Sequence, residues 1–384
     1  MSYIQYLEVS FKFRVRKFMK LFKSLLVAPA ALGLLAPMSA TANEVTINDF
    51  NAAEEIAVTN SRVDGLEARF NNLEAGSFSE TTTASFSADM AIGAVDGDTT
   101  GEAIGAIYGF QIDLNTSFTG EDSLDISIDA GSDAASLDML DLNSTTGDLL
   151  KVDGISYTFP LGEKTTVFVG DSMDGSTLYN TACVYGGQTI QIDDCGNSGA
   201  AFAAGLGTAA GASYDFGNGF TAAIGYEGEG ATAGKGLMTK EGIDVFGGQV
   251  TYTGDNYGVS VTYSDYEGTN DTAYTALNAY YVPESAGSLP SISAGYETAS
   301  VEGATDKEQW MVGLQWDEVG AGTLGVAIAT DGLQLENASD LYVYEAFYSY
   351  PMNDGMTITP IVFIKEVSST VEETGIAVKT SFSF

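Results

Sequence analysis

The side chains that could do chemistry in this chain are carboxylates and two cysteines, because the sequence contains no histidine. Without histidine, Ser-His and Cys-His nucleophiles and His-ligated metal sites are excluded, so we expect neither catalytic residues nor a metal centre. Asp and Glu number 52 against 15 Lys and Arg, which gives a formal net charge of −37. Such a surface repels nucleic acid. Hydrophobic residues at 45% nevertheless favour an ordered fold over acidic disorder.

The two cysteines, Cys183 and Cys195, lie in one polar segment. In an exported chain we expect them to form a disulfide, which would stabilise the short loop by roughly 3 kcal/mol. A reactive thiol pair is the alternative, although neither a histidine nor a nearby lysine is present to lower a thiol pKa.

One acidic segment resembles the opening of a calcium-binding loop. Asp96–Gly101 has aspartate at its first and third positions and glycine at its sixth. An EF-hand also needs Glu at the twelfth position, where Ile107 stands. We therefore expect a loop tip and no cofactor. Divalent cations that bridge surface carboxylates to lipopolysaccharide are a separate alternative.

The first 53 residues have the pattern of an export signal and its flanks. Residues 19–42 combine two lysines, an apolar run over 25–35 and small residues at 40–42, which predicts a signal peptide. Residues 1–18 then read as an upstream extension of the reading frame, and residues 43–53 as a short linker. A transmembrane anchor is the alternative, but it needs about 20 apolar residues.

Residues 54–76 change to the spacing of a helix, with three heptads. We expect a periplasmic coiled coil that holds three subunits in register, because so short a helix is marginal alone. The alternative is one amphipathic helix packed on its own domain. The coiled-coil core positions are Ile56, Val63, Leu66, Phe70 and Leu73.

The remainder, residues 77–384, alternates apolar and polar residues with a period of two. The last stretch, Gly375–Phe384, ends on an aromatic residue, which is unusual for a soluble edge strand. In a membrane barrel the last strand must pair with the first to remove every sheet edge. Counting strands gives about sixteen, with Ala200–Phe216 taken as one long strand. The sequence thus predicts an all-β, transmembrane antiparallel barrel, with Phe382 and Phe384 as its insertion signal.

Every second connection is short, as in outer-membrane barrels with short periplasmic turns, except Val282–Pro290, which is longer than a tight turn. The third outer loop, Asp171–Gly199, carries both cysteines. In general porins that loop narrows the channel, so by resemblance we expect a constriction here; an external cap is the alternative. Its candidate residues are Asp171, Asp174, Asp193 and Asp194.

The polar side of the strands should line a water-filled lumen. Because aspartate outnumbers lysine there, we expect modest cation preference, unless most acids form only a solvated outer coat. The pore-lining candidates are Asp89, Gln111, Asp113, Asn115, Asp125, Asp129, Gln315, Lys379 and Ser381.

Three features together resemble a known family: residues 19–37, the run at 62–75 (RVDGLEARFNNLEA) and the Phe-ended strand. They are similar to cyanobacterial outer-membrane porins of the Som type, related to OprB-like carbohydrate-selective porins. The resemblance implies a trimeric diffusion pore in the outer membrane, inserted by the barrel-assembly machinery. The surface-layer-homology domain usual in that family is missing, so wall attachment does not carry over. A sugar-selective pore, a non-conducting structural or adhesion barrel and a barrel enzyme are the alternatives.

Overall fold

A computed structural model describes residues 82–384, apart from 98–102, 133–136, 141, 143–146, 201–206, 231–235, 240–241, 269 and 285–288. The expected signal peptide, linker and heptad helix with its core positions lie outside the described residues. So does most of the segment that resembles a calcium loop.

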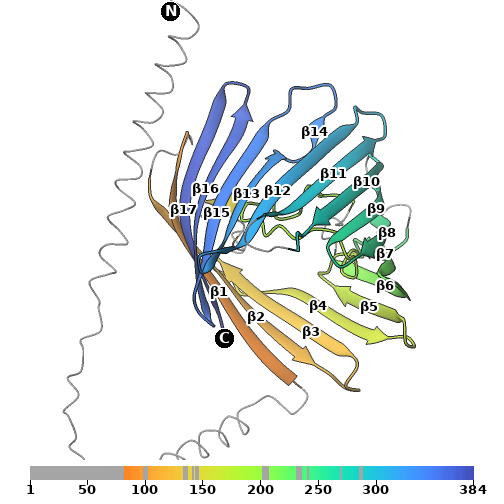
Figure 1. Ribbon diagram of the computed structural model, residues 1–384. Coiled ribbons are helices and arrows are strands. Elements are labelled where there is room, and N and C mark those ends of the chain that lie inside the picture. The colour runs from red at the N-terminus through yellow and green to blue at the C-terminus, as the bar shows by residue number, and fades with distance from the viewer. Residues whose placement is uncertain are drawn as a thin grey trace, which may run out of the picture. The chain divides into compact units, whose positions relative to one another are not determined.

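The described chain forms one antiparallel sheet that closes on itself (Figure 1). Alternating side chains favour this arrangement, because each strand can then show an apolar face outward and a polar face inward. The strands are β1 (Thr82–Asp96), β2 (Gly105–Thr116), β3 (Ser123–Gly131), β4 (Lys151–Pro160), β5 (Thr165–Asp171), β6 (Thr208–Gly217), β7 (Phe220–Gly228), β8 (Asp244–Thr253), β9 (Tyr257–Glu267), β10 (Thr272–Tyr281), β11 (Ser291–Val301), β12 (Lys307–Val319), β13 (Gly322–Thr330), β14 (Gln334–Leu335), β15 (Tyr342–Asn353), β16 (Met356–Ser368) and β17 (Val371–Ser383).

Closure occurs between the first and last strands, as predicted. β1 pairs antiparallel with both β2 and β17. The terminal residue takes part, since Phe86 N donates to Phe384 O at 2.9 Å and Phe384 N donates to Phe86 O at 3.0 Å. Their rings stack with centroids 5.7 Å apart. The closed barrel therefore leaves no free edge at the seam.

The predicted count of sixteen strands is confirmed, β14 being a two-residue addition in an outer connection. One predicted boundary is wrong: the strand drawn as Ala200–Phe216 begins only at Thr208. Ala200 is buried, and its N–H donates to a carboxylate on β11 rather than to a neighbouring strand. The large apolar residues of this stretch all fall on even-numbered positions, and that pattern alone did not reveal that the chain leaves the sheet before Thr208.

The outward face is apolar, as the alternation predicted. Met90, Ile224, Val250 and Leu277 are each more than half exposed, and their strand neighbours in sequence point to the opposite side of the sheet. Tyr344 and Tyr350 share this outward face, opposite the buried Glu345. An apolar belt with aromatic residues toward its rims is typical of barrels that sit in lipid.

Candidate functional site

All the predicted pore-lining residues except Gln315 lie on four neighbouring strands, β1, β2, β3 and β17. Directly paired residues share one side of a sheet, and the register pairs Gln111 with Asp129 and Asn115 with Asp125. Asp89 pairs with Ser381, and Lys379 follows on the same side. Gln315 lies on β12, on the same inward side but far around the barrel. The structure thus brings most candidates onto one patch of the inner wall.

Hydrogen bonds fix several of these carboxylates. Gln111 Nε2 donates to Asp113 Oδ1 at 2.7 Å, and Ser127 Oγ donates to the same oxygen at 2.6 Å. Asn115 Nδ2 donates to Asp125 Oδ1 at 2.6 Å. The amide and hydroxyl donors therefore fix the positions of these acids on the wall.

A β-bulge in β4 adds another carboxylate to this wall. The pairing of β3 with β4 shifts between Ser127 and Ile128, so that Ser127 pairs with Gly154 and Ile128 with Val152. Asp153 is the extra residue, and it is exposed to water. Asp129 and Asp113 act on it electrostatically. We call Asp113, Asp125, Asp129 and Asp153 the acidic wall.

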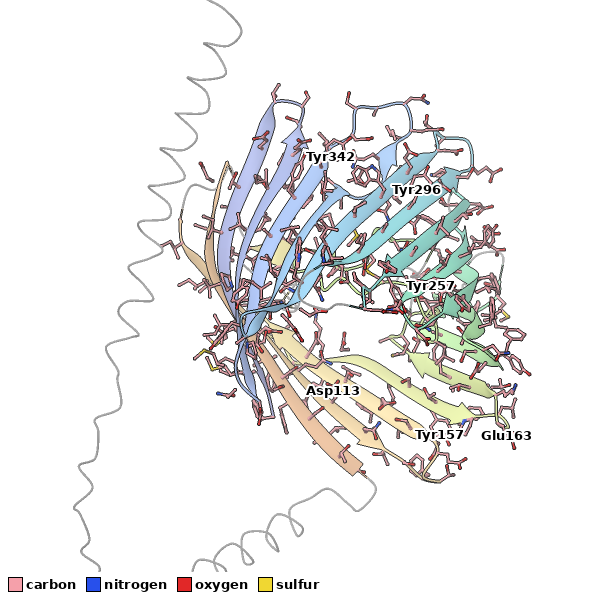
Figure 2. The ribbon with its side chains drawn as sticks, viewed as in Figure 1. Asp113, Tyr157, Glu163, Tyr257, Tyr296 and Tyr342 are labelled. Atoms are coloured by element: carbon pink, nitrogen blue, oxygen red, sulfur yellow. A yellow bond between two sulfur atoms is a disulfide. The ribbon has the colours of Figure 1, made fainter. Side chains whose placement is uncertain are left out.

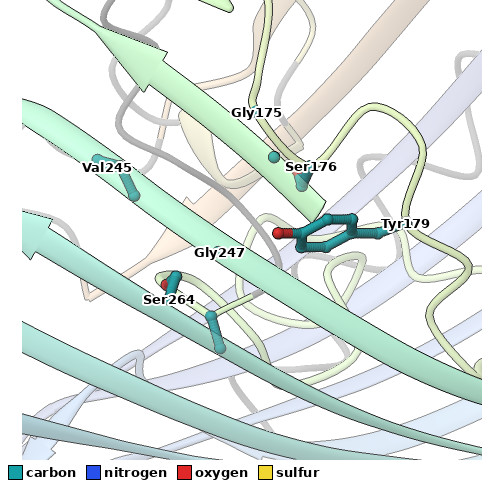
Figure 3. A pocket seen from close by; sticks show the side chains of 8 residues that line it. Gly175, Ser176, Tyr179, Val245, Gly247 and Ser264 are labelled. Carbon is teal, nitrogen blue, oxygen red and sulfur yellow. The ribbon is translucent and has the colours of Figure 1, made fainter. Parts of the chain in front are cut away.

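The connection between β5 and β6 folds into the barrel (Figure 1), and its described part, residues 172–200, is called the inner loop below. Its backbone N–H groups donate to side chains on β8, β9 and β12: Asn180 N to Gln249, Ala182 N to Ser260 and Gly186 N to Gln315, at 2.6 to 3.0 Å. Figure 3 shows Tyr179 of this loop beside the β8 wall. The inner loop therefore lies against the inner wall of the barrel from β7 to β15.

Three glutamates anchor the inner loop: Glu227 on β7, Glu297 on β11 and Glu345 on β15. Their relative exposures are 0%, 0% and 3%. Glu227 accepts from Gly175 N at 3.0 Å. Glu345 accepts from Tyr185 OH and Gln188 N at 3.0 Å and from Thr189 Oγ1 at 2.7 Å. Because a carboxylate group can accept several hydrogen bonds, each of these glutamates can hold backbone N–H groups of the inner loop against its strand.

Glu297 makes the densest of these contacts. It accepts from Ser198 N at 3.2 Å, Gly199 N at 3.1 Å and Ala200 N at 2.7 Å. Ser198 Oγ and Gln309 Nε2 each donate to Oε1 at 3.1 Å. The carboxylate thus closes the end of the inner loop onto β11.

Glycines allow the loop to lie directly on the wall. At Gly295 on β11, an added Cβ would collide with the carbonyl oxygen of Cys195, and at Gly225 on β7 it would collide with that of Gly175. Glycine in a strand often marks such a close approach of another backbone.

Part of the interior is apolar, which corrects the expectation that every inward side chain is hydrophilic. The connection between β3 and β4 also turns inward through a short 3-10 helix, η2 (Asp138–Leu140), and Ile190 N of the inner loop donates to Met139 O at 3.0 Å. Inward apolar residues of β1, β2 and β12–β17 pack on both segments because the loops exclude water from them. This apolar plug comprises Ala91, Val95, Ile107, Leu137, Met139, Leu140, Leu142, Tyr185, Ile192, Cys195, Met311, Ala329, Val343, Phe347, Ile361, Phe363 and Ala377.

Cys183 and Cys195 form a disulfide with a Cα–Cα distance of 6.4 Å. Cys195 is buried in the apolar plug, and Cys183 packs against it. Asn278 Nδ2 donates to Cys195 O at 3.0 Å. The disulfide therefore closes the part of the inner loop that contacts Glu345 and Met139.

The four predicted constriction residues are not gathered at one point. Asp171 ends β5 and is exposed. Asp174 starts the inner loop, where burial and then the nearby Asp153 carboxylate raise its pKa above the ordinary value. Asp193 and Asp194 are exposed, with Asp194 N donating to Asp193 Oδ1 at 2.9 Å. Of the four, Asp174 adjoins the acidic wall.

Sequence reasoning missed the three anchoring glutamates and Asp153. The glutamates lie at inward positions of predicted strands, where a polar residue was expected, and nothing local distinguishes them from lumen residues. Asp153 was missed because the bulge leaves Val152 and Ile155 both outward, which breaks strict alternation.

The fold and inward loop define the class of structure: a sixteen-stranded porin-like barrel. No family model matches the sequence. Over 156 residues the chain is 31% identical to an uncharacterized protein of Nostoc sp.; the match spans 36% of this chain and 27% of that protein.

Among solved structures, OprB of Pseudomonas putida is similar with a TM-score of 0.58 and 11% identity, covering 79% of this chain and 94% of that one. An anion-selective porin from Comamonas acidovorans has a TM-score of 0.56 and 14% identity, covering 79% and 99%. A variant of the Rh. blastica porin has a TM-score of 0.51 and 13% identity, covering 79% and 100%. At these identities the likeness establishes the fold alone.

Proposed function

We propose that this protein is a porin: a membrane channel for passive diffusion of ions and small hydrophilic solutes. The observation that carries the proposal is the acidic wall, a group of four carboxylates on the inner side of a closed cylinder whose outer face is apolar. A barrel with this number of strands is wide enough to hold a water-filled passage. The inner loop and the apolar plug occupy part of that width, so we infer that solutes pass beside the acidic wall on β2, β3 and β4.

We further propose modest cation preference. Carboxylates in a passage with low-dielectric walls concentrate cations and retard anions. No arginine follows Arg69 in the sequence, so lysines alone supply positive side chains to the barrel. The Comamonas acidovorans porin, which has a similar fold, is described as anion-selective. We therefore assign the sign of selectivity in this chain to the side chains of the wall, not to the fold.

The location and assembly follow from the same proposal. We place the barrel in an outer membrane, exported by the predicted signal peptide, with lipid around its apolar belt and lipopolysaccharide at the rim of its long connections. Phe382 and Phe384 remain the proposed signal for the barrel-assembly machinery, and the heptads support a homotrimer.

Liposomes loaded with KCl and carrying the purified protein test the selectivity. In a KCl gradient, we expect a diffusion potential of the sign set by K⁺ permeation, detected with a potential-sensitive dye. A variant that changes Asp113, Asp129 and Asp153 to Asn should lose most of this potential, whereas Asp354→Asn, in an exposed turn, should keep it. A potential of the opposite sign in the wild-type protein would contradict cation preference.

A further inference from the structure

Asp129 on β3 has a buried carboxylate to which no described residue is bonded. Its relative exposure is 6%, and among the described residues its side chain makes neither a hydrogen bond nor an ion pair. Its register partner Lys151 is exposed and makes no ion pair with it. Buried charges in proteins are as a rule paired or bound to a metal ion, and a buried polar group with no protein partner points to a water or an ion.

Other carboxylates lie around the same part of the wall. Asp153, the bulge residue of β4, is acted on electrostatically first by Asp129 and then by Asp113. Asp174, at the start of the inner loop, is acted on by Asp153 in the same way. Figure 2 labels Asp113 on this wall. The carboxylates therefore come from three strands and from the loop that folds onto them.

Close packing holds the start of the inner loop beside Asp153. An added Cβ at Gly154 would lie 2.8 Å from Met173 Sδ, and one at Gly170 would lie 2.7 Å from Met173 Cγ. Glycine at both positions lets Met173 lie directly on β4 and β5. This contact fixes the neighbouring Asp174 near the acidic wall.

The charge in this region is mostly uncompensated. The strands β2, β3 and β5 and the inner loop contain no lysine or arginine, and β4 contains only Lys151. Like charges repel one another, so a cation between these carboxylates would be attracted to the site. Carboxylate, hydroxyl and carbonyl oxygens are the ligands that suit Mg²⁺, Ca²⁺ and Mn²⁺.

The ligand count favours an ion that keeps its water. Among the described residues, no group of three or more His, Cys, Asp or Glu side chains could hold a metal ion by itself. Ca²⁺ takes roughly six to eight oxygen ligands. Mg²⁺ needs fewer from the protein, because it loses water reluctantly and is usually bound through one or two carboxylates.

We propose that Asp129 and Asp153 bind a hydrated divalent cation of the Mg²⁺ class inside the barrel, with Asp113 and Asp174 adding negative charge around it. The ion keeps most of its water, so it exchanges with the solution. While it is bound, it obstructs K⁺ that passes along the acidic wall. This last step rests on the proposed channel function, whereas the binding itself does not.

Mn²⁺, an ion of the same class, is the probe for binding to the full-length protein in detergent. Free Mn²⁺ is measured by its paramagnetic resonance signal, and Mg²⁺ is then added as the competitor. We expect the wild type to bind one ion more tightly than D129N/D153N, by roughly tenfold, and Mg²⁺ to displace it. Asp153→Asn alone changes an exposed residue and should weaken the same binding without disturbing the buried Asp129.

Asp317→Asn is the matched control. Asp317 lies on β12 and accepts from Gln315 Nε2 at 2.7 Å, much as Asp113 accepts from Gln111. This variant should bind Mn²⁺ as the wild type does. Equal Mn²⁺ binding by the wild type and D129N/D153N, or bound Mn²⁺ that Mg²⁺ does not displace, would overturn the proposal.

Current through a planar bilayer separates the site from the channel. In KCl, added MgCl₂ should reduce the wild-type K⁺ current, and Asp153→Asn should need roughly tenfold more MgCl₂ for the same reduction. A current that Mg²⁺ does not reduce would overturn the place of the ion in the passage. A protein that binds Mn²⁺ through Asp129 and Asp153 yet passes no current would refute the channel and leave the cation site standing.

Discussion

Removing the Glu297 carboxylate should release the end of the inner loop from the barrel wall. The side chain accepts from three consecutive backbone N–H groups, of Ser198, Gly199 and Ala200. In Glu297→Ala those donors lose their acceptor, at a cost of about 1–3 kcal/mol for each donor that stays buried. Lumen water can reach part of this segment, so we expect about 3 kcal/mol in total. Since 1.4 kcal/mol is a factor of ten, release of this loop end should become roughly 100-fold more frequent.

The assays are single-channel noise and limited proteolysis of the reconstituted protein. Glu297→Ala should show added current fluctuations and faster cleavage within residues 172–200, with the barrel itself still protected. Glu308→Ala is the matched control, because Glu308 lies next to the inward Gln309 on β12, faces outward and accepts from Tyr296 OH at 2.6 Å. Wild-type noise and cleavage in Glu297→Ala would refute the anchoring role of this carboxylate.

Three further perturbations test other parts of the structure. The Tyr157 hydroxyl, then donors of Thr119 and Ser117, hold the pKa of Asp122 well below its ordinary value in the β2–β3 turn. A carboxyl group with a lowered folded-state pKa stabilises the fold above its unfolded pKa of about 4. The free energy of unfolding of the wild type should therefore exceed that of Asp122→Asn at neutral pH, and this difference should shrink as the pH falls below about 4. Thermal unfolding of both proteins across pH measures the difference, and a difference that does not depend on pH would contradict the assignment. Gly295→Ala should force the Cys195 carbonyl off β11 and increase channel noise, whereas unchanged recordings would mean that the loop accommodates a Cβ there. Phe384→Ala loses the stacking on Phe86 at the seam and should slow barrel assembly in a heat-modifiable gel-shift assay; assembly at the wild-type rate would show that the seam does not need this ring.

The barrel was predictable because its strands alternate between an apolar outward face and an inward face. Outward side chains such as Met90 and Ile92 are exposed and apolar, which leaves a period of two in the sequence. The interior has no such pattern. Met311 and Phe363 face inward yet are fully buried, because loops distant in sequence cover them, and local periodicity does not encode that packing.

The sequence predicted which aspartates lie on the inner wall, but not the contacts that the inward side chains make. Alternation placed Asp113 and Asp129 on the inner wall, since their strands are regular. The bulge that adds Asp153 changes the parity of one strand, and only pairing with β3 defines it. The roles of Glu297 and Glu345 depend on contacts about 100 to 160 residues away in sequence, so their function as loop anchors required the fold.

The central claim is that the closed barrel conducts, and single-channel recording of the purified full-length protein in a planar bilayer tests it most directly. We expect discrete current steps in KCl, each with a reversal potential of the sign set by K⁺ in a salt gradient. Membranes that hold the correctly inserted barrel, verified by protease protection, and yet show no current steps would contradict it.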